Sequence, residues 1–121
     1  LINMRLSCKY FNELLNCDMF WLNRSINRYK IPIDIMTKYK KDSWYEYYYK
    51  LRRVLEINHQ DDILIIGSID DRLDYVIISL LKGANIHTYN DYPLILATNY
   101  GYFDIVKYLV EKGANIRALN N

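Results

Sequence analysis

Hydrophobic residues recur at helical spacing close to the C-terminal end of the chain. Within residues 103–112, positions i, i+3, i+6 and i+7 are Phe103, Val106, Leu109 and Val110. Because these positions share one side of an α-helix, the pattern predicts an amphipathic helix. Gly113 follows the last helical position, where glycine readily adopts the left-handed conformation that ends a helix.

A shorter helix is predicted over residues 93–100. Pro93 would occupy its first turn, where the missing N–H costs nothing, and Gly101 separates it from the helix that follows. Small Ala97 would lie between the two helices. Two short antiparallel helices closed by Gly-Ala-Asn-Ile form a unit that cannot bury its apolar face alone.

The four-residue sequence that closes this unit, which we call the closing word, occurs twice. Gly-Ala-Asn-Ile begins at Gly83 and again at Gly113, 30 residues later. A self-match at a period of this size is typical of stacked helical repeats. Function would then come from a surface rather than from a catalytic cleft.

An earlier and more divergent copy precedes the first closing word. Residues 63–81 align with residues 93–110, with a one-residue slip at the end, and Asp71 stands at the position of Gly101. An alternative is a buried strand over residues 63–66, because four successive Ile or Leu residues are also typical of strands.

The second copy resembles the ankyrin repeat. The family pattern is T-P-L-H-x-A, then glycine, an apolar second helix and G-A-D. The matching residues are Tyr92-Pro-Leu-Ile-Leu-Ala97, Gly101, Ile105-Val106, Leu109-Val110 and Gly113-Ala-Asn-Ile116. Tyr92 replaces the threonine and Ile95 the histidine, which removes side chains that brace the turn. The period is 30 rather than 33 residues, so we expect a shortened finger between Gly83 and Pro93.

The N-terminal half also has a helical pattern. Ser43 with Glu46 three residues later forms a capping box, which predicts the start of a helix. One face of that helix would carry Trp44, Tyr48, Leu51 and Leu55. Asp18 would cap a helix carrying Leu22, Ile26 and Tyr29, a further helix would carry Met4, Cys8, Phe11 and Leu15, and Pro32 would break the chain between these and the Ser43 helix.

The predicted fold is all-α, a short ankyrin-type array preceded by a helical segment. Residues 1–60 would be this capping segment, and 61–121 the array, with repeats over 61–90 and 91–120 and the start of another. Fewer than three repeats are rarely stable alone, so we expect residues 1–60 to cap the array or the chain to be a fragment. The first residue is Leu, which favours a fragment.

Residues 5–24 are similar to the second half of an F-box, in which a leucine-rich helix precedes an acidic turn and a tryptophan. The residues concerned are Leu6-Ser-Cys-Lys-Tyr-Phe-Asn-Glu-Leu-Leu15, Asp18 and Trp21. The resemblance implies docking onto the adaptor of a cullin-type ubiquitin ligase, with the repeats selecting what is brought to it. The first helix of an F-box would lie before Leu1, and ordinary core packing is the alternative explanation of the pattern.

Composition narrows the class of protein. Ile, Asn, Lys and Tyr supply 50 of 121 residues, which is typical of an A/T-rich genome and, with the two resemblances, is similar to ankyrin proteins of large DNA viruses. No apolar run approaches the ~20 residues of a membrane span, and two cysteines give no disulfide framework. We therefore expect a cytoplasmic protein, in the host cytoplasm if viral, with no membrane contact.

No pattern of catalysis is present. His59 and His87 stand without other ligands at metal-binding spacing, and the chain has no phosphate loop, nucleophile elbow or paired-cysteine motif. The acidic pairs 61–62 and 70–71 fall at helix starts and turns, where carboxylates favour solvent and the helix dipole. The chain is predicted not to be an enzyme and to need no metal or cofactor.

Single-stranded nucleic acid binding is an alternative function. Residues 38–53 interleave basic and aromatic side chains, which could neutralise phosphates and stack bases. Residues 1–60 carry 11 basic and 6 acidic side chains, against 5 and 8 in the rest of the chain. This excess is mild and half of the rings fall on the predicted core face, so nucleic acid is the less favoured partner.

A protein is the expected partner, and the ankyrin resemblance implies where it binds. In that family the finger tips and the groove along the first helices contact partners. The corresponding residues here are His87, Thr88, Tyr89, Asn90 and Tyr92 in the finger, and Asn99, Tyr100 and Tyr102 at the groove. Tyrosine suits such contacts because it offers a large area with only two torsions to restrict. The alternative is that Tyr92 and Tyr102 only brace the loop.

Overall fold

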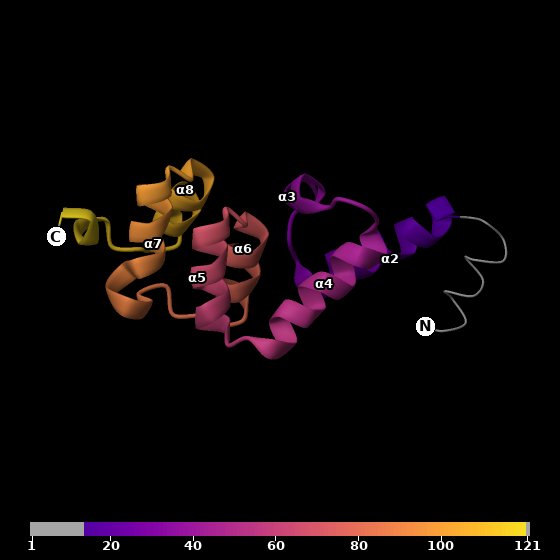
Figure 1. The fold of residues 1–121 in the computed structure, drawn as a ribbon, viewed down its shortest axis with the longest axis horizontal. Helices are drawn as coiled ribbons and strands as arrows, with labels where there is room; N and C mark the ends of the chain where they lie inside the picture. The colour runs from indigo at the N-terminus through magenta and orange to yellow at the C-terminus, as the bar shows by residue number, and fades with distance from the viewer. Residues whose placement is uncertain (1–13, 121) are drawn as a thin grey trace. The chain divides into compact units, whose positions relative to one another are not determined.

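The computed structural model describes residues 14–120, and all of its regular structure is helical (Figure 1). The helices are α2 (Leu14–Tyr29), α3 (Ile33–Tyr39), α4 (Trp44–Ile57), α5 (Gln60–Asp70), α6 (Leu73–Leu81), α7 (Thr88–Tyr100), α8 (Phe103–Glu111) and the 3-10 helix η1 (Ile116–Asn120). The all-α prediction is confirmed. The alternative of a strand over residues 63–66 is wrong, because these residues lie inside α5.

The chain divides into two compact units between Arg53 and Val54, whereas the sequence-based division was placed after residue 60. We call them the N-terminal and the C-terminal unit. In neither unit does a described helix combine the length and apolar character needed to cross a membrane.

An aromatic cluster forms the core of the N-terminal unit. Trp21 is fully buried, and its ring lies 5.1 to 5.4 Å from the rings of Tyr45, Tyr48 and Tyr49 on α4. The hydroxyl of buried Tyr29 donates to the backbone carbonyl of Tyr48 at 3.0 Å. Burial raises the pKa of the Tyr29 phenol well above its ordinary value, so this donor stays protonated.

Helix α4 begins where the capping box predicted. The backbone N–H of Glu46 donates to Ser43 Oγ at 3.2 Å, and Trp44, Tyr48 and Leu51 of the predicted face are buried while Leu55 is half-buried. Pro32 breaks the chain as predicted, since α2 ends before it and α3 begins directly after it.

The predicted role of Asp18 is wrong. Helix α2 runs through Asp18, so the residue does not start a helix. Its Oδ1 instead accepts the backbone N–H of Trp44 at 2.7 Å. The first N–H groups of a helix have no partner within it, and this carboxylate supplies one for α4. The helix predicted to carry Met4, Cys8, Phe11 and Leu15 falls largely outside the described residues.

Two helix pairs build the C-terminal unit (Figure 1). Helix α5 packs on α6 and α7, and α8 packs on α7 and α6, so α5 and α7 form one layer and α6 and α8 the other. The core runs through both pairs and contains Leu64, Val76, Leu94, Ala97, Ile105, Leu109 and Ala114. This arrangement is consistent with an ankyrin repeat array.

The predicted buried face of α8 is only partly right. Leu109 is fully buried and Val106 and Val110 are partly buried, but Phe103 is 82% exposed. The helix packs through Ile105 and Leu109, one turn apart. Phe103 precedes Ile105 by two residues, about 200° around the helix, and therefore points away from the core.

The repeated closing word ends the second helix of each pair in the same way. Gly83 and Gly113 have φ of 94° and 102°, which is the left-handed conformation predicted for Gly113. The N–H of the alanine after each glycine donates to the carbonyl five residues earlier, at 2.9 Å in both copies. This is the Schellman arrangement, which satisfies carbonyls left free at a helix end.

The turn inside each pair is also shared. Asp71 and Gly101 both adopt positive φ, at 56° and 76°, and end α5 and α7. The alignment of these two positions is therefore confirmed.

Candidate functional site

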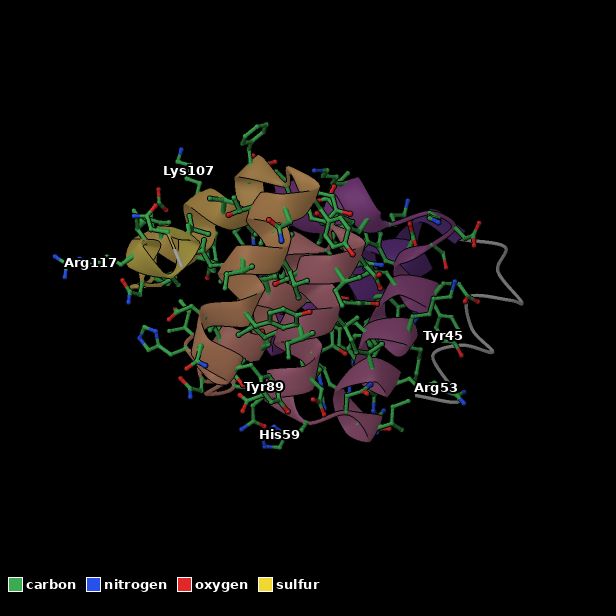
Figure 2. All side chains as sticks on the ribbon, turned by 60° about the vertical axis from the view of Figure 1, so that its left-hand side comes forward. Tyr45, Arg53, His59, Tyr89, Lys107 and Arg117 are labelled. Carbon is green, nitrogen blue, oxygen red and sulfur yellow. The ribbon has the colours of Figure 1, made fainter. Side chains whose placement is uncertain are left out.

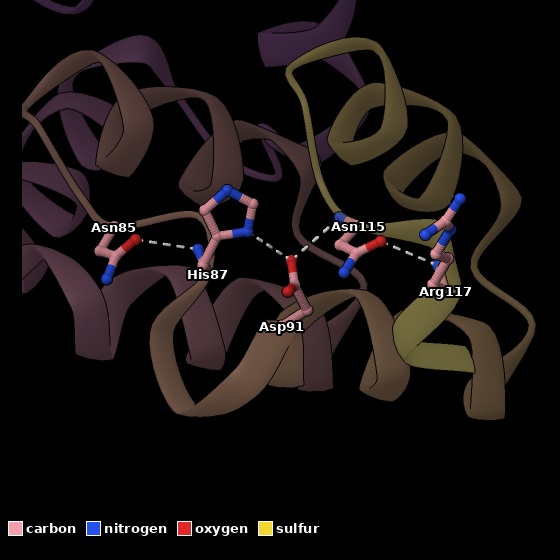
Figure 3. A network of polar contacts seen from close by, with 5 residues as sticks. All are labelled: Asn85, His87, Asp91, Asn115 and Arg117. Atoms are coloured by element: carbon pink, nitrogen blue, oxygen red, sulfur yellow. Dashed lines mark hydrogen bonds and ion pairs between the residues drawn. The ribbon is translucent and has the colours of Figure 1, made fainter. Parts of the chain in front are cut away.

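In each copy of the helix pair, an aspartate near the start accepts a hydrogen bond from the Gly-Ala-Asn-Ile turn at the end of that copy. Asp61 Oδ1 accepts the backbone N–H of Asn85 at 2.8 Å. Asp91 Oδ1 accepts the backbone N–H of Asn115 at 3.1 Å (Figure 3). Both the acids and the asparagines are 30 residues apart. The same hydrogen bond is thus built twice, and we call each one a clamp.

The asparagine side chain completes the turn. Asn85 Oδ1 accepts the N–H of His87, and Asn115 Oδ1 accepts the N–H of Arg117, both at 3.0 Å (Figure 3). Asparagine forms such local turns readily because its side-chain oxygen reaches the backbone two residues on. The third residue of Gly-Ala-Asn-Ile therefore has a structural role in both copies.

The clamps were missed by the sequence analysis, although a signal for them was present. Asp61 and Asp91 repeat at the period of the closing word. A search of the acids for that same period would have paired them.

The finger between Gly83 and Pro93 is a tight turn without a strand. Tyr89, Asn90 and Asp91 all have φ between 50° and 61°, and they interrupt α7 before its regular part. This conformation is costly for residues with a Cβ, so other contacts must hold it.

Asp91 provides those contacts. It is buried, and besides the Asn115 N–H its Oδ1 lies 2.8 Å from His87 Nδ1 at the other end of the turn (Figure 3). One carboxylate thus fixes both the finger and the closing turn of its copy.

The structure leaves most of the predicted partner-binding residues accessible. Exposed are His87, Tyr89, Asn90, Tyr92, Asn99 and Tyr100, while Tyr102 is half-buried and Thr88 is buried. Figure 2 shows Tyr89 on the finger, and its side chain is 71% exposed. Thr88 is 9% exposed and therefore offers little surface to a partner.

Tyr102 combines a surface and a bracing position. Its hydroxyl donates to the Ile69 carbonyl at 3.0 Å, and its ring stacks on that of Tyr100 with centroids 5.5 Å apart. The contact with Ile69 ties the second copy to the end of α5. For Tyr102 the geometry therefore favours bracing, whereas Tyr92 remains 42% exposed.

The predicted residues form two clusters rather than one. Tyr89 and Tyr92 lie at the start of α7 and Tyr100 at its end, about 12 Å apart along the helix at 1.5 Å per residue. Between them, Ile95 shares a face with Tyr92 and Asn99, at i, i+3 and i+7.

The same spacing recurs on α5. Asp62, Ile65 and Ile69 stand 30 residues before Tyr92, Ile95 and Asn99, and each is exposed or half-buried. Helices α5 and α7 pack side by side, so their outward residues form one surface. We call these six residues the first-helix face. Sequence reasoning missed its three isoleucines, although the 30-residue period marks them.

The first-helix face and the finger offer contact area rather than reactive groups. His59 Nδ1 accepts the N–H of Asp61, and His87 contacts Asp91. Over residues 14–120, no three His, Cys, Asp or Glu side chains gather in a way that could hold a metal ion.

The basic, aromatic segment 38–53 turns most of its rings inward. Trp44, Tyr47 and Tyr48 are buried, and the rings of Tyr45 and Tyr49 pack on Trp21. Base stacking needs exposed ring faces, so this arrangement does not favour the nucleic-acid alternative.

The comparison with protein families matches the second copy of the helix pair. Residues 89–121 match the family model described as ankyrin repeat. A segment of 46 residues is 44% identical to part of an ankyrin repeat protein of Acanthamoeba polyphaga mimivirus. The match covers 38% of this chain and 35% of that relative, so the chain spans about a third of the length of the viral protein. No solved structure matches the chain significantly.

Proposed function

We propose that the C-terminal unit binds another protein through the first-helix face, the finger and Tyr100 at the end of α7. Ankyrin repeats are in general interaction modules, and residues 89–121 match that family. The observation that carries the proposal is the placement of Tyr89 in the finger, Tyr92 at the start of the regular part of α7 and Tyr100 at its end, which are 71%, 42% and 55% exposed. Large apolar side chains are costly to leave in water, and tyrosines are enriched where proteins meet.

The surface around these tyrosines is held firmly. The clamp at Asp91 fixes the finger, and Tyr102 fixes the end of α7 to Ile69. A preorganised surface loses little conformational entropy on binding, which favours affinity.

Its chemistry also indicates the kind of partner. The first-helix face combines isoleucines, a tyrosine and an asparagine with Asp62 as its one charged residue. An apolar centre with a polar rim is the composition of protein interfaces. We therefore expect a partner with an apolar surface rather than a strongly charged one.

The test combines two substitutions with a matched control. Tyr89→Ala with Tyr100→Ala removes the ring at each end of α7, while Phe103→Ala removes an exposed ring from α8 in the other layer. Proteins captured by each purified variant are quantified by mass spectrometry, and folding is checked by circular dichroism.

We expect the double variant to keep its helical signal and to lose a specific partner at least tenfold, as removal of two hot-spot rings at about 1–2 kcal/mol each implies. Phe103→Ala should capture that partner normally. Equal capture by all variants would refute this surface, and loss of the helical signal would place the rings in the core.

From the sequence resemblance of residues 5–24, we further propose that the N-terminal segment docks on the adaptor of a cullin-type ubiquitin ligase, in the cytoplasm. Part of this segment lies outside the described residues. Trp21 is fully buried against α4, so it would support such a surface rather than contact the adaptor.

Titration calorimetry with the purified adaptor tests this second proposal. Binding that is weakened by Leu6→Asp but not by Ile57→Asp, an exposed position at the end of α4, would support it. No binding at 100 µM adaptor, on the order of the weakest useful affinity, would contradict this second proposal. The proposed protein-binding surface of the C-terminal unit would be unaffected.

A further inference from the structure

The N-terminal unit carries an open surface cavity of about 380 Å³, which shares no residue with the surface proposed above. It is lined by Phe20, Asn23, Arg24, Asn27, Arg28 and Tyr48. Five of these residues lie on α2 at i, i+3, i+4, i+7 and i+8, so they share one face of that helix. The volume lies in the range of small-ligand sites, roughly 300–1,000 Å³.

Two arginines line this cavity one helical turn apart. Arg24 lies with its guanidinium carbon 5.7 Å from the ring centre of Tyr48, and its Nε donates to the Tyr48 hydroxyl at 3.2 Å. Arg28 lies 5.9 Å from the ring centre of Tyr29. Stacking on rings orients both groups, while most of their N–H donors remain available for a ligand.

Neither arginine forms an ion pair with any carboxylate in residues 14–120. The nearest acid on the same helix, Asp18, accepts the backbone N–H of Trp44 instead. Two like charges at i and i+4 destabilise a helix, and an anion bound between them would reverse that effect.

The remaining lining defines the ligand further. Asn23 and Asn27 are exposed one turn apart and add amide donors beside the arginines. A phosphoryl group has three acceptor oxygens and up to two negative charges at neutral pH, which suits this many donors better than a single carboxylate does. Phe20 is half-buried, so its exposed part offers an apolar surface beside the donors, while the Tyr48 ring is buried and lies under Arg24.

We propose that this cavity binds a phosphate monoester, with the phosphoryl group between Arg24 and Arg28 and an apolar or aromatic stem against Phe20. The phosphoryl group can come from a phosphorylated side chain of a protein or from a free small ester, and both present the same chemistry to the cavity. A single-stranded nucleic acid, with singly charged diesters, fits the two arginines less well.

The test titrates phenyl phosphate and inorganic phosphate into the full chain by calorimetry. Phenyl phosphate should bind at least tenfold more tightly than inorganic phosphate, because the stem adds apolar contact. Arg28→Gln, at an exposed position, should weaken binding of phenyl phosphate at least tenfold, and Arg24→Lys should weaken it less because the charge remains.

Arg53→Gln is the matched control, since it removes the same charge from an exposed position on α4 outside the cavity lining (Figure 2). It should bind phenyl phosphate like the parent chain. Equal weakening by Arg53→Gln and Arg28→Gln would overturn the proposal, because the effect would then be one of net charge. Undetectable binding of phenyl phosphate at 1 mM, on the order of the weakest affinity considered, would also overturn it.

Two further probes separate the sources. A phosphotyrosine peptide that binds more tightly than phenyl phosphate supports a phosphorylated protein, whereas equal affinity for the peptide and for a nucleoside monophosphate supports a small ester. An unphosphorylated single-stranded oligonucleotide that binds at this cavity and is not displaced by phenyl phosphate would contradict a monoester site.

Discussion

The two copies of the helix pair are built by the same backbone hydrogen bonds but by only some of the same side chains. Each has an acid at its start, an asparagine turn at its end and a left-handed residue between its helices. Most other positions differ. The comparison shows which positions repeat. They are the residues that satisfy backbone N–H and C=O groups, while the outward positions are free to vary.

The copies also differ where their helices approach most closely. Ala97 is fully buried at the position that Gly67 occupies in the first copy. A Cβ built on Gly67 would lie 2.9 Å from the Arg72 carbonyl oxygen and 3.0 Å from a Val76 methyl. The α5–α6 pair therefore leaves no room for a methyl group that the α7–α8 pair accommodates.

Replacing a leucine of the shared core should have the largest effect on the free energy of unfolding. Leu64→Ala and Leu94→Ala, 30 residues apart and both buried, should each lower the free energy of unfolding by about 2–5 kcal/mol. Urea unfolding followed by circular dichroism measures this. Phe103→Ala should change it by less than about 0.5 kcal/mol, as expected at an exposed site. A loss at Phe103 equal to that at Leu94 would mean that α8 packs through a different face.

The close approach at Gly67 can be tested by exchanging residues between the copies. Gly67→Ala should cost about 1–3 kcal/mol, since the new methyl meets backbone and side-chain atoms. Ala97→Gly should cost about 1–2 kcal/mol, through lower helix propensity and loss of a buried methyl group. If thermal unfolding shows Gly67→Ala to be stabilising, helix propensity outweighs sterics and the two pairs are spaced alike.

The clamps should differ in strength. Asp91 has a side chain 8% exposed and contacts both Asn115 and His87, whereas the Asp61 side chain is 30% exposed. Asp91→Ala should therefore cost about 1–3 kcal/mol and Asp61→Ala about 0.5–1 kcal/mol in chemical unfolding. The reverse order would show that burial does not set the strength of this contact.

The smallest effect is expected at the turn inside the first copy. Asp71→Gly removes a Cβ from a left-handed residue, so it should raise stability by up to about 1 kcal/mol. Gly101→Asp should lower stability by a similar amount in the second copy. A destabilising Asp71→Gly in thermal unfolding would show that the aspartate side chain contributes more than its backbone strain costs.

The elements predicted correctly are those with local signals. Ser43 with Glu46 fixed the start of α4, and the glycine after each second helix fixed its end. Both signals act within four or five residues, and no distant contact overrides them.

The residues missed or misjudged depend on contacts distant in sequence. Asp18 is a residue type that often caps helices, but its carboxylate accepts the backbone N–H of Trp44, 26 residues away. The face of α8 depends on which side α7 covers, which the spacing of apolar residues alone does not decide. The left-handed run at Tyr89 contains no glycine, and Asn90 and Asp91, which tolerate this conformation, gave only a weak sign of it.

The candidate site was predicted in outline. The ankyrin resemblance led to the exposed tyrosines of α7, but not to Ile65, Ile69 and Ile95 of the first-helix face, which depend on the packing of α5 beside α7. Whether a partner uses that face stays a prediction.

The claim that residues 61–120 form two copies of one unit is tested most directly by amide hydrogen exchange at Asn85 and Asn115. Both N–H groups should exchange slowly, since each is bound to the aspartate 24 residues before it. Asp91→Ala should speed exchange at Asn115 and leave Asn85 unchanged, and Asp61→Ala should do the opposite. If either substitution leaves its own asparagine protected, the repeated clamp does not exist and the two segments are not copies of one unit.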